Sequence, residues 1–206
     1  MIVGLTGRIA TGKTTVAAIL EELGATIINA DEIARELARP GSEVLEEIVK
    51  EFGPGFLECD GTLNRKKLGE RVFGDAGALE RLNGVFHPRL RREISERLKE
   101  MGREPCERPV VVEAAVLFEM GADSLVDKVV VTDCAPETQV KRLLERGLGR
   151  EEAEARVDSQ MSREEFLRRA DVVIGTGGSL AETKQQVLTV WRGHLPECQG
   201  QGAAQQ

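Results

Sequence analysis

The residues that most constrain this chain are Gly7 to Thr14, which read G-R-I-A-T-G-K-T and fit the phosphate-loop pattern G-x-x-x-x-G-K-[ST] in full. Gly7 and Gly12 permit backbone angles that a side chain would forbid, so that backbone N–H groups can curl around phosphate oxygens. Lys13 can reach the β- and γ-phosphates as a point charge, and the hydroxyl of Thr14 can ligate Mg²⁺. The pattern therefore predicts a site for a phosphate chain and Mg²⁺.

The segments on either side of this loop have the structure that the motif requires. A short apolar run from Ile2 to Leu5 precedes it and is typical of a buried parallel strand. After Lys13, apolar residues recur at helical spacing, and Gly24 stands where a helix C-cap belongs. Such a helix would aim its positive N-terminal end at the bound phosphate. The alternative, a glycine turn before an ordinary helix, is disfavoured by this strand and helix.

Length and composition limit the class of protein. The chain has 206 residues, 41% of them hydrophobic, which suits one α/β domain. Its net charge is −7, which argues against a dedicated nucleic-acid binder. Aromatic residues make up only 3% of the chain, so stacking platforms for single strands are not expected. We expect no nucleic-acid partner.

The cysteines and the apolar segments bear on location. Cys59, Cys106, Cys134 and Cys198 lie far apart and form no C-x-x-C pair, so we expect reduced thiols rather than a zinc site. The chain passes from Met1 directly into the first strand, without a signal segment. No apolar stretch approaches the roughly 20 residues that a membrane span needs. These features predict a soluble, cytoplasmic protein with no membrane partner.

Five short apolar runs alternate with helical segments along the chain. Besides the first run, strands are expected at 26–28, 110–114, 128–132 and 171–174. Helices are expected after the loop, from Glu32, over 43–51, 65–73, 76–83, 87–101 and 137–146, from Arg150, and over 180–191. This alternation predicts a phosphate-loop α/β fold whose five-stranded parallel sheet is flanked by helices on both faces.

Candidate functional residues follow the predicted strands. Ligands of such sheets bind at the carboxyl ends of the strands. The phosphate loop, Asn29 to Asp31, Glu113 and Asp133 all lie at or just beyond a predicted strand end. We therefore expect them to gather at one rim of the sheet.

Two functional classes compete for a phosphate-loop protein of this size, a switch GTPase and a small-molecule kinase. A GTPase would carry a D-x-x-G switch after a strand and an N-K-x-D base-reading loop. The chain has no N-K-x-D, and its D-G-T-L at 60–63 and D-A-G-A at 75–78 follow no suitable strand. A kinase needs a group near the acceptor and mobile cations over the transferred phosphoryl group. Asp31 supplies the first, and the arginine-rich stretch 142–169 can supply the second.

A colinear set of motifs resembles the dephospho-CoA kinase family over nearly all of the chain up to about residue 193. The matching segments are L-T-G-R-I-A-T-G-K-T-T at 5–15, N-A-D at 29–31, I-A-R at 33–35, D-G-T-L-N-R at 60–65, H-P at 87–88, A-V-L-F-E at 115–119, Q-V-K-R-L-L-E-R at 139–146 and A-D-V-V-I at 170–174. The resemblance implies transfer of the γ-phosphoryl group of ATP, with Mg²⁺, to the ribose 3′-hydroxyl of dephospho-CoA, which gives CoA and ADP.

The resemblance also implies an organisation. A single kinase domain over 1–196 would contain an inserted helical substrate region at about 32–105 and a lid at about 142–169. Residues 197–206 are expected to be a disordered tail. We expect a monomer or a weak oligomer.

The motif positions carry the family's roles to particular residues. Asp31 is expected to orient or accept the proton of the attacking hydroxyl, together with Lys13 and Arg142 at the reacting phosphates. The expected nucleotide site comprises Gly7, Ala10, Thr11, Gly12, Lys13, Thr14, Thr15, Arg142 and Arg146. The expected acceptor site comprises Thr6, Asp31, Arg65 and His87. Thr14, and Glu113 through water, are expected to hold Mg²⁺.

Each role has a plainer structural alternative. Asp31 could be a helix N-cap, and Thr6 a β-branched residue that ends a strand. His87 could make a structural hydrogen bond at the start of a long helix, and Arg65 could be an exposed helix-start arginine. Arg142 and Arg146, at i,i+4 spacing, could belong to a solvated charged face.

The chain departs from the family pattern at a few positions. Asn29 replaces the first Asp of D-A-D, and Arg8 replaces the second glycine of the loop, adding a cation beside the phosphates. Ala115 replaces a proline, and Gly175-Thr176 replace Asp-Asn after the last strand. Two other readings stay open: a kinase for another nucleoside or metabolite hydroxyl, and a nucleotide-binding regulatory module without turnover.

Overall fold

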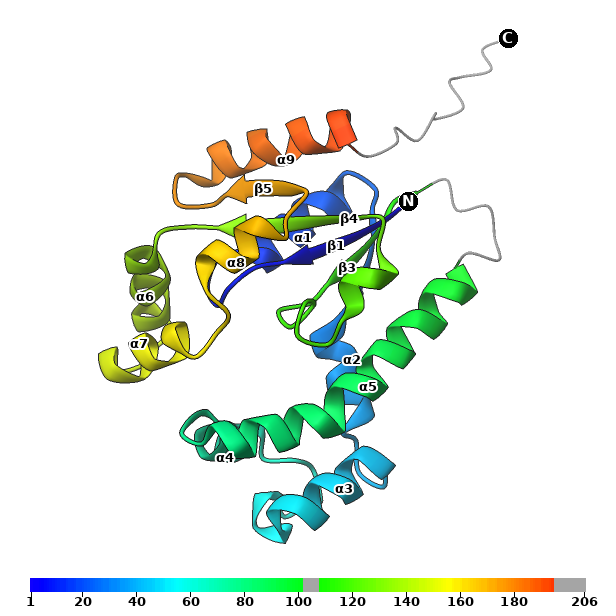
Figure 1. Cartoon of the computed structure of the whole chain (residues 1–206), viewed down its shortest axis with the longest axis vertical. Coiled ribbons are helices and arrows are strands. Elements are labelled where there is room, and N and C mark those ends of the chain that lie inside the picture. The colour runs from blue at the N-terminus through cyan, green and yellow to red at the C-terminus, as the bar shows by residue number, and fades with distance from the viewer. Residues whose placement is uncertain (102–107, 195–206) are drawn as a thin grey trace.

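The computed structural model describes residues 1–101 and 108–194, so the expected tail at 197–206 lies outside it. Its strands form one parallel sheet in the order β2-β3-β1-β4-β5 (Figure 1). The predicted five-stranded parallel sheet is confirmed. The strands are β1 (Ile2–Thr6), β2 (Thr26–Asn29), β3 (Val110–Glu113), β4 (Lys128–Asp133) and β5 (Val172–Gly175).

One face of the sheet is covered by α1 (Lys13–Glu22) and α9 (Leu180–His194). Successive residues of a strand point to opposite faces, and the central strands β1, β3 and β4 have runs of consecutive apolar residues. Val111 of β3 therefore packs toward α1 and α9, while its neighbours Val110 and Val112 pack toward the other face. This burial on both sides explains the near-continuous apolar runs in the sequence.

The other face is covered by α2 (Ala30–Leu37), by the second half of α5 (Ala76–Met101) and by α8 (Arg163–Arg168). Helix α2 begins two residues earlier than expected, because Asn29 is its N-cap. The Asn29 Oδ1 atom accepts hydrogen bonds from the backbone N–H groups of Asp31 and Glu32. The structure therefore gives the cap to Asn29 rather than to Asp31.

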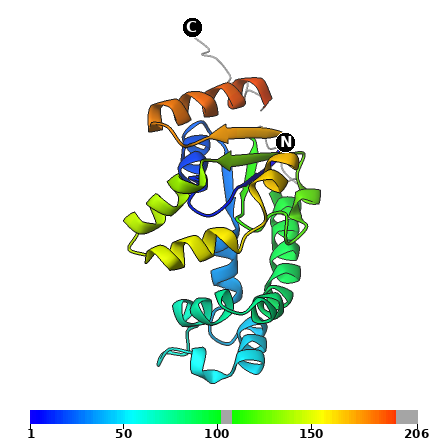
Figure 2. The same ribbon diagram turned by 60° about the vertical axis from the view of Figure 1, so that its left-hand side comes forward.

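A helical region lies beyond one end of the sheet, in the lower part of both views (Figures 1 and 2). It has its own apolar cluster, separate from the two clusters that cover the sheet. Ala38, Val44 and Ile48 contribute to this cluster. The region comprises α3 (Glu43–Phe52), the short 3₁₀ helix η1 (Pro54–Phe56), α4 (Arg65–Phe73) and the first half of α5.

The two helices expected at 76–83 and 87–101 are one 26-residue helix, α5, with Pro88 inside it. A proline inside a helix removes one backbone hydrogen bond and costs about 3 kcal/mol or more, and for that reason the sequence predicted a helix start there. Side chains on both sides of Pro88 are held by packing. Phe86 packs in the cluster of the helical region, and Leu90 is buried against the sheet. This packing keeps the helix continuous.

Two further helices, α6 (Pro136–Glu145) and α7 (Arg150–Asp158), follow β4 and project from the sheet beside the phosphate loop (Figure 2). They share with the loop a small apolar cluster, which comprises Ala10, Leu143, Ala153 and Val157. The 3₁₀ helix η2 spans Ala122–Leu125. Of the helices in the described ranges, none is both long and apolar enough to cross a membrane.

Candidate active site

The phosphate loop connects β1 to α1, and its glycines adopt the angles that the motif predicts. Gly7 has φ +151° and Gly12 has φ +83°. A Cβ atom on Gly7 would lie 2.4 Å from the Oγ1 atom of Thr132, so no other residue fits there without moving β4. Thr11 is buried, and its hydroxyl donates to the carbonyl of Arg8 at 2.7 Å. Gly12 caps α1, which directs the helix N-terminus at the loop.

Ala10 is the one residue other than glycine with positive φ (+59°) among those that the structure describes. Such a left-handed conformation is disfavoured for residues with a Cβ atom. The methyl group of Ala10 is buried against the α6–α7 cluster, and this packing compensates for the strain. The amino-acid sequence alone did not indicate that Ala10 connects the loop to these helices.

Lys13 folds back onto the loop. Its Nζ atom donates to the carbonyls of Gly7 (2.8 Å) and Arg8 (3.2 Å). Burial lowers the pKa of this amine, whereas Asp31 and Glu113 favour its charged form. A phosphate oxygen would offer the ammonium group a stronger acceptor than a carbonyl does. The side chain is therefore already at the position where the loop would hold phosphates.

Glu113 ends β3 at the same rim. Its carboxylate accepts a hydrogen bond from the Thr14 hydroxyl (3.0 Å) and another from the Asn29 side-chain amide (3.1 Å). Burial raises the pKa of Glu113, an effect that the Thr14 hydrogen bond and Lys13 oppose. Asn29 thus provides a neutral donor at the position where the family pattern has an acid, and it also caps α2.

The donor atoms at this rim suit Mg²⁺. A hydroxyl from Thr14 and a carboxylate from Glu113 are hard oxygen ligands. No group of three or more His, Cys, Asp or Glu side chains that could hold a metal occurs within 1–101 and 108–194. This agrees with the usual way of holding Mg²⁺, through one or two protein ligands and the phosphates of a substrate.

Asp31 lies in the first turn of α2 and is exposed. It is close enough to Lys13 to favour the ammonium form, and it has the same effect on the guanidinium of Arg65. Its carboxylate therefore interacts electrostatically with the phosphate-loop lysine and with an arginine of the helical region.

The other three expected acceptor residues lie at different depths in the structure. Thr6 is fully buried, and its hydroxyl donates to the carbonyl of Ala115 at 3.5 Å. His87 is half-buried in the middle of α5, where it hydrogen-bonds the backbone of Glu119, and burial lowers its pKa. Arg65 is exposed at the start of α4 and donates to the carbonyl of Ala34 at 3.0 Å.

Arg142 and Arg146 lie on the other side of the loop. Two nitrogens of the Arg142 guanidinium donate to backbone carbonyls, Nη1 to Ala10 (3.0 Å) and Nη2 to Thr176. Arg146 is close enough to Lys13 to disfavour its charged form. Both arginines line a cavity of about 210 Å³ beside the loop. Its other lining residues are Ala10, Gly12, Thr15, Thr176, Gly178, Leu180 and Thr183.

The departures from the family pattern have structural consequences. The hydroxyl of Thr176 donates to the carbonyl of Thr11 at 2.6 Å, so the segment after β5 is bonded to the phosphate loop. Gly175 is bonded through its backbone to Gln186 of α9. Arg8 was expected beside the phosphates. Its guanidinium instead donates to the carbonyl of Val157 in α7.

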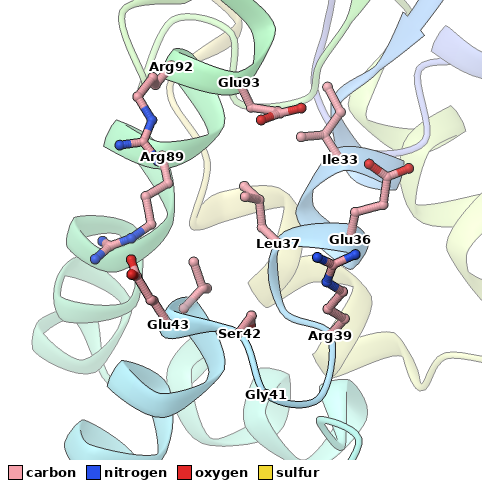
Figure 3. A pocket seen from close by; sticks show the side chains of 11 residues that line it. Ile33, Glu36, Leu37, Arg39, Gly41, Ser42, Glu43, Arg89, Arg92 and Glu93 are labelled. Atoms are coloured by element: carbon pink, nitrogen blue, oxygen red, sulfur yellow. The ribbon is translucent and has the colours of Figure 1, made fainter. Parts of the chain in front are cut away.

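A larger recess of about 430 Å³ lies between α2, the turn that follows it and α5 (Figure 3). It lies apart from the rim, because Ile33, Glu36 and Leu37 are on the opposite side of α2 from Asp31, given about 100° per residue. Several of its charged side chains are already in ion pairs, including Glu36 with Arg97. We assign it no part in the site.

Sequence reasoning missed contacts that depend on tertiary structure. Arg163, at the start of α8, forms a bidentate ion pair with Asp133 at the end of β4 (2.8 and 2.5 Å). Thr132 shares a hydrogen bond with Thr11 beneath the loop. The expectation that polar residues gather at the strand ends was sufficient to include Asp133, but nothing local pointed to Arg163 as its partner.

The sequence model of the dephospho-CoA kinase family matches residues 1–182 of the chain. The chain belongs to the dephospho-CoA kinase family. A dephospho-CoA kinase of Symbiobacterium thermophilum is 47% identical over 203 residues, covering 98% of this chain and 83% of the relative. One from Moorella thermoacetica is 45% identical and covers 93% and 91%.

Solved structures agree with this membership of the dephospho-CoA kinase family. The structure of a dephospho-CoA kinase from Campylobacter jejuni superposes with a TM-score of 0.67 at 33% identity, and covers 93% of this chain and 95% of its own. A shikimate kinase structure from Aquifex aeolicus, at 16% identity and a TM-score of 0.52, covers 94% and 97%. The second likeness concerns the fold alone.

Proposed function

We propose that this chain is an ATP-dependent dephospho-CoA kinase that phosphorylates the ribose 3′-hydroxyl of dephospho-CoA, giving CoA and ADP. The observation that carries the proposal is the phosphate loop, where Lys13 is hydrogen-bonded to the carbonyls of Gly7 and Arg8 and Thr14 donates to Glu113 at the end of β3. Family membership over nearly the whole chain supports the choice of acceptor. The loop would bind ATP, and the helices α2 to α5 would form the substrate region.

Residues on both sides of the loop have roles in this reaction. Lys13, Arg142 and Arg146 would neutralise charge on the phosphates, which is the main requirement of phosphoryl transfer. Asp31 would orient the acceptor hydroxyl and receive its proton. Mg²⁺, held by Thr14 and through water by Glu113, would supply further charge neutralisation. Thr6, His87 and Arg65 would contact the acceptor.

The lid would comprise about residues 142–169, from the last turn of α6 through α7 and α8, and the whole would act as one domain over 1–196. We further propose that the enzyme is a monomer or weak oligomer of the cytoplasm, without a nucleic-acid partner. The net charge of −7 supports the absence of a nucleic-acid partner. The free thiols of Cys59 and Cys134 support a reducing compartment. Light scattering of the purified protein at several concentrations tests the oligomeric state.

The test of function measures ATP consumption by the purified chain with Mg²⁺ and dephospho-CoA, with a panel of nucleosides, or with no acceptor. Turnover only with dephospho-CoA, and CoA identified by mass, is the expected result. Equal turnover with a nucleoside would indicate a different kinase, and ATP binding without turnover a regulatory module. The Lys13→Ala protein, purified in the same way, controls for contaminating kinases.

A further inference from the structure

Arg8 is buried between the phosphate loop and α7. The residue is only 9% exposed, and its Nη2 atom donates to the carbonyl of Val157 at 2.5 Å. The same residue's carbonyl accepts hydrogen bonds from Lys13 and Thr11. One residue therefore connects the phosphate-binding loop to the proposed lid.

The end of α7 is a favourable site for this guanidinium. The helix ends at Asp158, so Val157 has one of the last four carbonyls, which lack an intrahelical N–H donor. The C-terminal end of a helix also carries partial negative charge and attracts cations. Hydrogen bonds to charged groups contribute more than neutral ones, and most when water is excluded.

Neighbouring contacts reinforce the connection. The backbone N–H of Ile9 donates to the Oε1 atom of Gln160 at 2.6 Å, just beyond the end of α7. Ala10, whose backbone is strained to φ +59°, is buried in the same apolar cluster as Val157. Arg8, Ile9 and Ala10 together with Val157 and Gln160 are called the loop–lid contact below.

The loop–lid contact restricts the positions of the two arginines that line the cavity beside the loop. Helix α7 packs on α6, and Leu143 of α6 shares the apolar cluster with Ala10 and Val157. Arg142, adjacent to Leu143, is bonded to the loop carbonyl of Ala10. Fixing α7 to the loop therefore also limits where Arg142 and Arg146 can lie.

We propose that Arg8 is a positioning residue, which holds α7 against the phosphate loop and thereby keeps Arg142 and Arg146 ready to bind the phosphates. Arg8 stands at a position where the family pattern has a glycine. The proposal rests on the proposed function only in taking ATP as the ligand of the loop. The test measures ATP binding directly. Its result therefore does not depend on whether dephospho-CoA is the acceptor.

The decisive variant is Arg8→Ala. Calorimetry should find ATP·Mg²⁺ bound about tenfold more weakly, the loss expected for one buried charge-assisted hydrogen bond. In the ligand-free protein, the amides of 150–160 should exchange hydrogen faster than in the parent. With dephospho-CoA as acceptor, KM for ATP should rise while kcat stays within about threefold, since the lost binding is common to ground and transition states.

Two further variants keep the proposal falsifiable if Arg8→Ala folds poorly. Arg8→Lys should recover part of the affinity, because an ammonium group can donate to the same carbonyl without the guanidinium's reach. Gln160→Ala should weaken ATP binding in the same direction but less, since it removes a neutral hydrogen bond. Arg150→Ala, which removes an exposed cation from the same helix, is the matched control and should bind ATP like the parent.

Unchanged ATP affinity and unchanged exchange of 150–160 in Arg8→Ala would overturn the proposal. Equal losses of affinity for ATP and acceptor, with a lower unfolding temperature and no recovery in Arg8→Lys, would also overturn it. That result would mean that Arg8 only stabilises the fold.

Discussion

The phosphate loop and the helical region differ in how their functional side chains are held. Lys13 and Thr11 are hydrogen-bonded within the loop, and Arg142 is bonded to the loop from outside. In the helical region, Arg65 is exposed and donates to one backbone carbonyl. The side chains of the proposed nucleotide side are thus held by hydrogen bonds to one loop, whereas those of the proposed acceptor side come from separate elements.

The two regions also have separate cores. The cluster formed by α3, α4 and the first half of α5 is distinct from those that cover the sheet, and α2 and α5 connect them. Substitutions in one region should therefore change the kinetics of one substrate more than those of the other. Asp31, which lies between the two, should change the rate of transfer rather than either affinity. Substitutions at four positions test this comparison.

The largest effect is expected for Lys13→Ala on the nucleotide side. Removing the cation that meets the phosphates should lower kcat/KM for ATP by about 10³-fold, near the upper end for one preorganised charge contact. Steady-state kinetics and ATP calorimetry measure it. Circular dichroism controls for folding, and normal ATP binding together with normal turnover would remove Lys13 from the site.

Asp31→Ala should lower kcat by about 10²-fold, the usual contribution of a positioned acid–base group. ATP affinity should stay near that of the parent, because the proposed phosphate contacts of Lys13, Arg142 and Arg146 remain. Asp31→Asn keeps the size of the side chain but cannot take a proton, and it should be as slow. Near-normal turnover of either variant would show that the transfer needs no carboxylate there.

Arg65→Ala tests the acceptor side alone. It should raise KM for dephospho-CoA by about tenfold, the loss of one charge-assisted contact to a phosphate, with KM for ATP unchanged. Arg71→Ala removes an exposed arginine of the same helix, α4, and serves as the control. If KM for ATP rises instead, the two regions are not separable in the way proposed.

The smallest effect concerns Glu113 and depends on pH. Its raised pKa means that the folded state binds this proton more readily than the unfolded state, so the ionised carboxylate costs stability at neutral pH. That cost disappears as pH falls below the pKa. Glu113→Gln should therefore raise the unfolding temperature slightly at pH 8 and not at pH 4.

The same variant should need more Mg²⁺ for half-maximal activity. We also expect the activity of the parent to fall as Glu113 protonates on acidification, and this fall should be lost in the variant. Thermal unfolding at the two pH values and a Mg²⁺ titration measure these effects. An unfolding temperature that changes equally at both pH values would contradict the role of the buried charge.

The sequence predicted the parts of the molecule that depend on local patterns. The apolar runs located all five strands, and residues just after them, such as Glu113, were correctly expected at one rim. Local rules failed where packing opposed them. Pro88 was expected to begin a helix, but burial of Phe86 and Leu90 on either side keeps α5 continuous. The direction of Arg8 depends on α7, 149 positions away, which no local pattern reveals.

The order of the strands has a consequence for folding. Strand β3 is the central partner of both β1 and β2, yet the helical region separates it from them in the chain. Asn29 and Glu113, which pair across β2 and β3, are 84 positions apart. Closing so long a loop costs entropy before any strand contact forms, whereas α3, α4 and the start of α5 meet through nearby residues. Pulse-labelled hydrogen exchange should therefore find the amides of these helices protected before those of β3. Such a result would place an early folding nucleus in the helical region, with the parallel sheet and its phosphate loop assembling last.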